Sequence, residues 1–245
     1  MTAPAAGGQI ILVSGGGWHY SGGADRATDP YLLRHTRGRQ PRICLVAAGQ
    51  GDSGQQYAGF VHHLGRSGFL SAAPVFSLLP GAGDPRKELL EADLIYMVGG
   101  NTAALTGVLR ELGWLPVLRR ALRGGATIAA VCAPALSLCS APVFRWANGL
   151  GAPRAAEGLG LVGASLSCHA ELLPEQTAAH ERAVLAGAVP AGWCLDDGAI
   201  LRLTPRGRLV EAVASRPGAR VTHLSTRDGR LVRRPLGLEL LPGAA

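Results

Sequence analysis

The chain has 245 residues, 47% hydrophobic and 17% charged, which is typical of a globular protein with a large core. It contains no apolar run long enough to cross a bilayer, and residues 1–9 lack the features of a signal peptide, so we expect a cytoplasmic protein that does not engage a membrane. The net charge of +7 comes from arginines scattered along the chain, and only 5% of residues are aromatic, which argues against a nucleic-acid binder.

Along residues 10–203, apolar runs alternate with segments of helical periodicity, a pattern that predicts an α/β fold. Strands are expected at residues 10–14, 42–47, 73–78, 94–98, 126–131, 161–167 and 199–203. Helices are expected at residues 55–66, 103–112, 115–123, 133–140 and 175–186. Residues 142–153 are rich in Gly and Pro and are expected to be irregular.

Residues 204–245 alternate apolar and polar side chains around short turns, which predicts C-terminal β-hairpins after the core of residues 10–203. We find neither an internal repeat nor a linker. The prediction is therefore one domain over residues 1–245, built on a doubly wound, mostly parallel sheet with helices on both faces.

One buried strand runs directly into a helix at Cys132, within the sequence AAVCAPA of residues 129–135. A sharp strand-to-helix turn presents its corner side chain at the open end of a sheet, which is the geometry of a nucleophile elbow. The small neighbours Ala130 and Ala133 suit such a turn, and Pro134 suits the first turn of the helix. A structural cysteine packed in the core explains the same segment equally well.

Other chemistry-bearing residues also follow predicted strands, where doubly wound sheets bind their ligands. His169 follows one strand, and Asp196 and Asp197 lie beside another, so either carboxylate is a candidate to orient the imidazole. We predict Cys132, His169 and Asp197 as catalytic residues. The N–H groups of Gly99, Gly100, Asn101 and Ala133 are predicted to line the oxyanion and substrate site.

Cofactors are not indicated by the sequence. The five cysteines are an odd set without C-x-x-C pairing, and the histidines and carboxylates lack metal-ligand spacing, so no metal is expected. The glycines of residues 15–17 lack the remainder of a dinucleotide fingerprint.

These motifs together resemble the dipeptidase E and cyanophycinase family of serine peptidases, in the class I glutamine amidotransferase-like superfamily. The resemblance spans residues 10–203 and rests on ILVSGGG at 11–17, ADLIYMVGGNT at 92–102, the elbow, His169, and LDDGAIL at 195–201. It implies a doubly wound fold and a peptidase acting on a small peptide or amide, with no nucleic-acid or membrane partner. The sequence leaves the oligomeric state open, a homodimer included.

The chain departs from the family pattern at the positions that carry the chemistry. The family elbow is Gly-x-Ser-Ala-Gly-Ala, so Cys132 stands in place of the serine, as in the cysteine elbows of PfpI-type proteins. The residues after His169 lack the family's substrate-binding arginines, and Asp196-Asp197 replaces an Asp-Glu pair. These differences argue against specificity for aspartyl dipeptides.

Three hypotheses remain at this level. The first is a hydrolase or acyltransferase with a cysteine nucleophile. The second is a non-catalytic binding or regulatory protein that keeps the peptidase fold and pocket. A redox sensor or small-carbonyl detoxifier ranks last, because the early strands offer no convincing candidate for the nearby carboxylic acid that such a protein usually needs.

Overall fold

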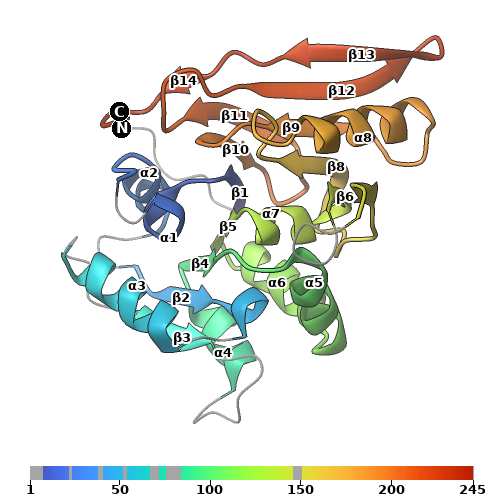
Figure 1. The fold of residues 1–245 in the computed structure, drawn as a ribbon. Coiled ribbons are helices and arrows are strands. Elements are labelled where there is room, and N and C mark those ends of the chain that lie inside the picture. The colour runs from blue at the N-terminus through green and yellow to red at the C-terminus, as the bar shows by residue number, and fades with distance from the viewer. Residues whose placement is uncertain are drawn as a thin grey trace.

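The computed structural model describes residues 8–21, 24–37, 41–51, 54–66, 72–75, 84–145 and 151–244. In this part of the chain helices pack against two β-sheets (Figure 1). The α/β fold predicted from the sequence is confirmed, and none of the described helices is long and apolar enough to span a membrane.

The larger sheet has eight strands in the order β14-β11-β10-β1-β5-β4-β2-β3. Its parallel part comprises β1 (Gln9–Ser14), β5 (Thr127–Val131), β4 (Leu94–Met97), β2 (Ile43–Val46) and β3 (Ala72–Val75). Beyond β1 the sheet continues through β10 (Ala199–Leu203), β11 (Leu209–Ala214) and β14 (Glu239–Leu240). The last three residues of the strand predicted at 73–78 lie outside the described residues.

Helices cover both faces of this sheet, because side chains alternate along each buried strand. Ile10 and Leu12 of β1 pack on one face, and Ile11 and Val13 pack on the other. The first face is covered by α4 (Pro85–Glu91), α5 (Thr102–Glu111), α6 (Trp114–Arg123) and α7 (Ala133–Leu138). The second is covered by α1 (Gly17–Ser21), α2 (Thr28–Arg34) and α3 (Gly54–Arg66). A short 3-10 helix, η1 (Ala48–Gln50), follows β2.

A second sheet has six strands in the order β13-β12-β9-β8-β6-β7. They are β13 (Arg230–Pro235), β12 (Val221–Arg227), β9 (Gly192–Leu195), β8 (Val162–Cys168), β6 (Cys139–Phe144) and β7 (Arg154–Ala155). The long β12–β13 hairpin lies at the top of Figure 1, above α8 (Pro174–Leu185). Leu166, Leu195 and Val221 of this sheet belong to the same buried cluster as Leu201 and Leu203 of the larger one, so the two sheets share a core.

The strand β6 corrects two expectations. The helix after Cys132 ends at Leu138 rather than near residue 140. Residues 142–144, expected to be irregular, belong to the strand Cys139–Phe144. Pro142 has no amide hydrogen, which argued against a strand. Its carbonyl nevertheless accepts a hydrogen bond from the N–H of Ala156 at 2.9 Å, and β6 pairs with β8.

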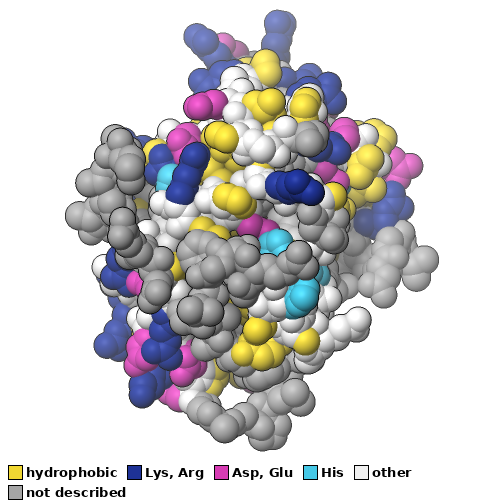
Figure 2. All heavy atoms as spheres, turned by 90° about the vertical axis from the view of Figure 1, so that its left-hand side faces the viewer, with side chains coloured by type: hydrophobic (Ala, Val, Ile, Leu, Met, Phe, Trp, Pro, Cys, Tyr) yellow, Lys and Arg dark blue, Asp and Glu magenta, His cyan; other side chains and the backbone are white. Residues whose placement is uncertain are grey.

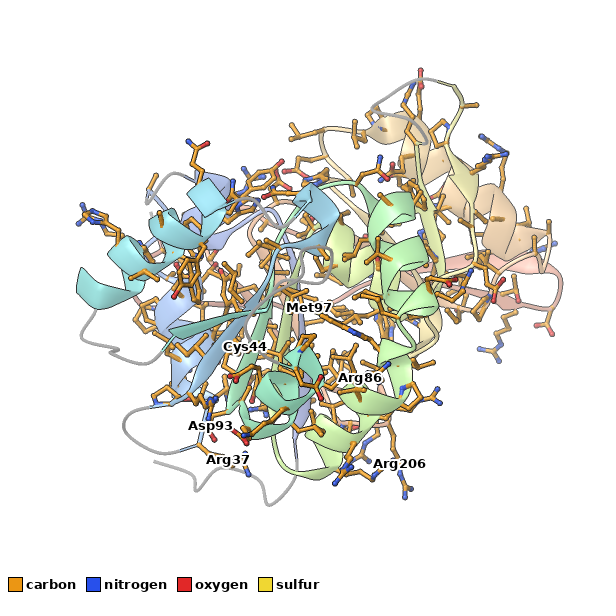
Figure 3. All side chains as sticks on the ribbon, turned by 90° about the horizontal axis from the view of Figure 1, so that it is seen from below. Arg37, Cys44, Arg86, Asp93, Met97 and Arg206 are labelled. Atoms are coloured by element: carbon orange, nitrogen blue, oxygen red, sulfur yellow. The ribbon has the colours of Figure 1, made fainter. Side chains whose placement is uncertain are left out.

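The N-terminal ends of the parallel strands are tied by ion pairs. The guanidinium of Arg37 lies 3.2 Å from the carboxylate of Asp93, the residue before β4. Figure 3 labels both residues in a view from below. In the same view Cys44 and Met97 point from the sheet into its core. The carboxyl ends of these strands lie at the opposite edge of the sheet, where doubly wound sheets bind their ligands.

Candidate active site

The predicted elbow is present between β5 and α7. Cys132 has φ 62° and ψ −111°, a backbone conformation that is rare for residues other than glycine. Its N–H donates to the carbonyl of Val13 at 2.8 Å, and its carbonyl accepts from the N–H of Leu136 at 3.1 Å. Ala130 and Ala133 are almost fully buried on either side. Such strain persists only where the surroundings impose it, and it is concentrated at functional sites.

His169 faces this cysteine from the end of β8. The Nε2 atom of His169 lies 3.0 Å from the Sγ atom of Cys132. His169 also has a positive φ, 59°, and its N–H donates to the Oγ atom of Ser14 at 2.9 Å. The Ser14 hydroxyl in turn donates to the carbonyl of Leu195 at 3.2 Å. Ser14 at the end of β1 therefore links the His169 turn to β9, a role that the sequence analysis missed.

Of the two candidate aspartates, Asp197 reaches the imidazole. Its Oδ1 atom forms a short hydrogen bond with Nδ1 of His169. The carboxylate of Asp196 instead accepts from the backbone N–H and the Nε atom of Arg220, at 3.1 and 2.9 Å. Gly15 makes room for Asp197, because a Cβ atom at Gly15 would lie 2.3 Å from Oδ1 of Asp197. The structure thus brings together Cys132, His169 and Asp197 and leaves Asp196 outside the cluster.

The environment of His169 favours its protonated form. Burial alone lowers the pKa of His169, but hydrogen bonds to Asp197 and Cys132 raise it to about 10. The side chains of His169 and Asp197 are 14% and 10% exposed, so water screens their interaction weakly. An imidazolium beside a thiol stabilises the thiolate, which is the reactive form of cysteine.

The other cysteines have different surroundings. Cys44, Cys139, Cys168 and Cys194 are buried, whereas Cys132 is partly exposed. Burial raises the pKa of the Cys194 thiol to about 11 and raises that of Cys44 further. Buried thiols of this kind are chemically inert, so Cys132 is the best placed of the five to react.

The predicted glycine turn follows β4 at the same edge of the sheet. Gly100 has φ 95°, and a Cβ atom there would lie 2.1 Å from the carbonyl oxygen of Gly49, so only glycine fits. Asn101 begins α5 as its N-cap, because its Oδ1 atom accepts from the N–H of Ala104 at 2.9 Å. A cleft of about 380 Å³ touches both Gly100 and His169. Asn101 therefore has a structural role in addition to lining this cleft.

Helix α1 adds a residue that the sequence analysis did not select. The ring of Tyr20 stacks on His169 with 5.4 Å between centroids and 19° between planes. The Tyr20 hydroxyl lies 3.4 Å from Nδ1 of His169. Two carboxylates hold the start of α1: Asp25 accepts from the N–H of Gly17, and Asp29 accepts from the N–H of Trp18, both at 2.9 Å.

The face that carries α1–α3 shows histidine side chains near its centre, with arginines spread around them (Figure 2).

An elbow cysteine, an imidazole and a carboxylate at the strand ends of an α/β sheet define a hydrolase-like site. The sequence profile of peptidase family S51 matches residues 10–207, and the chain belongs to this family.

Individual proteins are similar to this chain in sequence or in fold. The chain is 28% identical to the "uncharacterized peptidase YgaJ" of Bacillus subtilis (strain 168), over 95% of this chain and 99% of that protein. A crystal structure of a peptidase from an acI-B1 Actinobacterium has a similar fold, with a TM-score of 0.64, 18% identity and coverage of 95% of both chains. A putative peptidase E protein from Listeria monocytogenes EGD-e gives a TM-score of 0.52 at 15% identity, over 95% of this chain and all of that one.

Proposed function

We propose that this S51 peptidase cleaves a small peptide or amide with Cys132 as its nucleophile, His169 as the proton carrier and Asp197 as the residue that orients the imidazole. The observation that carries the proposal is the 3.0 Å separation of Sγ of Cys132 from Nε2 of His169, with Nδ1 bonded to Asp197. This chain of contacts supplies both a thiolate and a proton for the leaving group.

The first half of the reaction forms a thioester. The thiolate of Cys132 attacks the scissile carbonyl carbon, and the N–H groups of Gly100 and Ala133 stabilise the oxyanion. As the tetrahedral intermediate collapses, the C–N bond breaks and Nε2–H of His169 gives its proton to the departing amine. The acyl group stays on sulfur, and the imidazole is left neutral.

The second half releases the acid. Neutral His169 takes a proton from water, the hydroxide adds to the thioester carbon, and the C–S bond breaks to return the Cys132 thiolate beside an imidazolium. An amine in place of water would make the same site an acyltransferase. Cysteine suits both outcomes, because a thiolate is a strong nucleophile near neutral pH and a good leaving group.

The non-catalytic alternative receives less support. A protein that only binds its ligand has no need for the strained backbone at Cys132 or for an imidazole held between a thiol and a buried carboxylate. The aligned contacts of the three side chains favour turnover.

The test is selective labelling followed by activity measurement. Iodoacetamide at graded pH should alkylate Cys132 well before Cys44 or Cys194, and Cys132→Ala should abolish hydrolysis of amide substrates, a loss of several orders of magnitude (about 10⁴-fold or more). Arg37→Gln, at the far edge of the sheet, serves as the control and should leave the rate unchanged. Equal labelling of the three cysteines, or undiminished turnover by Cys132→Ala, would overturn the proposal.

A further inference from the structure

The cleft beside the triad is lined by three large apolar side chains together with polar ones, Asn101 and Thr102 among them. Its volume is about 380 Å³, and His169 and Gly100 both contact it, so a group bound there lies next to the proposed proton carrier and to one of the proposed oxyanion donors. Leu136 from α7, Phe144 from β6 and Leu173 at the start of α8 supply its apolar surface. A cleft of this size accommodates a large amino-acid side chain.

The side chains of Arg145 and Gln176 in this cleft already have hydrogen-bond partners. Arg145 is the charged residue besides His169 among the described residues that line it. The Arg145 guanidinium lies 2.6 Å from a carboxylate oxygen of Glu175 and donates to the carbonyl of Gly151 at 3.2 Å. The buried amide of Gln176 donates to the carbonyl of Cys168 at 2.9 Å, so it is anchored to the protein.

These surroundings discriminate between classes of side chain. A carboxylate entering the cleft would lose its hydration, and the Arg145 guanidinium is already paired with Glu175. An apolar side chain would instead displace water from Leu136, Phe144 and Leu173 and would break none of the existing hydrogen bonds. Loss of hydration also disfavours a basic side chain, which would in addition lie beside the protonated imidazole of His169.

We infer that this cleft is the specificity pocket of the peptidase and that it takes a large apolar side chain, of the size of Leu or Phe, from a residue that flanks the scissile bond. This inference rests on the proposed function and names its substrate class. It agrees with the differences from the family pattern, which argue against specificity for aspartyl dipeptides.

The first measurement is a substrate series. Dipeptides and dipeptide amides that carry Leu, Phe, Ala, Asp or Arg at each position in turn are assayed for release of free amine, with Cys132→Ala as the blank. We expect Leu or Phe to exceed both Ala and Asp in kcat/KM by about tenfold or more at one of the two positions.

The second measurement places this preference in the cleft. Leu173→Asp should reduce the Leu-to-Ala ratio of kcat/KM by about tenfold, because it puts a carboxylate in the pocket wall. This variant should fold, since residue 173 is the N-cap of α8, where aspartate is favourable. Leu172→Asp is the matched control: Leu172 is 61% exposed and does not line the cleft, so the ratio should not change.

Each of the following outcomes overturns the pocket assignment or the proposed function. Two results overturn the pocket assignment but leave the peptidase proposal intact. One is a preference for Asp that disappears in Arg145→Gln, and the other is equal rates for all side chains. A Leu-to-Ala ratio that Leu172→Asp lowers as much as Leu173→Asp also overturns it. The absence of any cleavage that depends on Cys132 overturns the proposed function, and the pocket assignment with it.

Discussion

The carboxylate of Glu171 accepts the backbone N–H of Asp197 through both of its oxygens, at 3.0 and 3.1 Å. On the other side of the same residue, Nε of Arg216 donates to the carbonyl of Asp197 at 2.7 Å. Arg216 and Glu171 also form an ion pair with each other. The two side chains therefore hold the peptide groups on both sides of Asp197, and Glu171 is a positioning residue for the proposed triad.

Replacement of Glu171 should reduce activity without removing a reacting group. Glu171→Ala is expected to lower kcat by about ten- to a hundredfold with little change in KM, because displacement of a catalytic carboxylate by about 1 Å has effects of this size. Glu171→Gln should recover part of the loss, since its amide oxygen still accepts the Asp197 N–H. Steady-state kinetics of the two variants test this.

A second Glu–Arg pair provides the control. Glu181 on α8 binds Arg233 of β13 at 2.5 and 2.8 Å and makes no contact with the triad residues. Glu181→Ala should leave kcat near its original value. A comparable loss of kcat in Glu181→Ala would indicate general destabilisation rather than positioning of Asp197.

The raised pKa of His169 predicts how stability depends on pH. The imidazole has a pKa of 6.5 when unperturbed and about 10 in the folded protein, so between these values the folded state binds a proton that the unfolded state has lost. The contribution of His169 to the free energy of unfolding should be fully present below pH 6.5 and should decrease as pH rises towards 10.

Urea denaturation of the wild type and His169→Gln at several pH values measures this contribution. The difference in unfolding free energy between the two proteins should shrink steadily from neutral to alkaline pH. Asp197→Asn removes the main interaction that raises the pKa, so its pH dependence between these limits should be weaker. A difference that stays constant across this range would contradict the protonated state of His169.

Tyr20 is expected to act through its ring rather than its hydroxyl. The ring covers one face of His169, whereas the Nδ1 atom near its hydroxyl is already bonded to Asp197. Tyr20→Phe should therefore keep most of the activity, and Tyr20→Ala should lower kcat by about tenfold through a less ordered imidazole. Kinetics together with the NMR signal of the His169 ring protons test the distinction; equal losses in both variants would assign the effect to the hydroxyl.

The sequence predicted the parts of the site that depend on local chain geometry. A buried strand followed by small residues and Pro134 defines the Cys132 elbow, and paired glycines define the turn before α5. Likewise, the parallel strands could be recognised because each is a short apolar run with a helix after it. These signals need no knowledge of distant contacts.

Long-range contacts could not be predicted from the sequence. The hydrogen-bond partners of Ser14, Tyr20 and Glu171 are separated from them in the sequence by 155, 149 and 26 positions, respectively. Nothing in the local sequence specifies those partners. The choice between Asp196 and Asp197 depends on Arg220, which comes from another turn. Similarly, β6 forms a strand because β8 and β7 pair with it on either side, although Pro142 locally disfavours one.

The strained backbone at Cys132 leads to a final prediction, that function and stability are opposed at this position. A non-glycine residue at φ 62° and ψ −111° is destabilised by about 1–3 kcal/mol. Alanine keeps the Cβ atom that causes the strain, whereas glycine removes it. Glycine also lowers the free energy of unfolding by about 0.5–1 kcal/mol, because it makes the unfolded chain more flexible. Cys132→Gly should therefore be more stable than Cys132→Ala by about 1 kcal/mol, although both are inactive. Equilibrium unfolding of the two variants in urea tests this: if Cys132→Gly is the less stable protein, the elbow is not strained, and the positive φ must be accommodated by Cys132 without penalty.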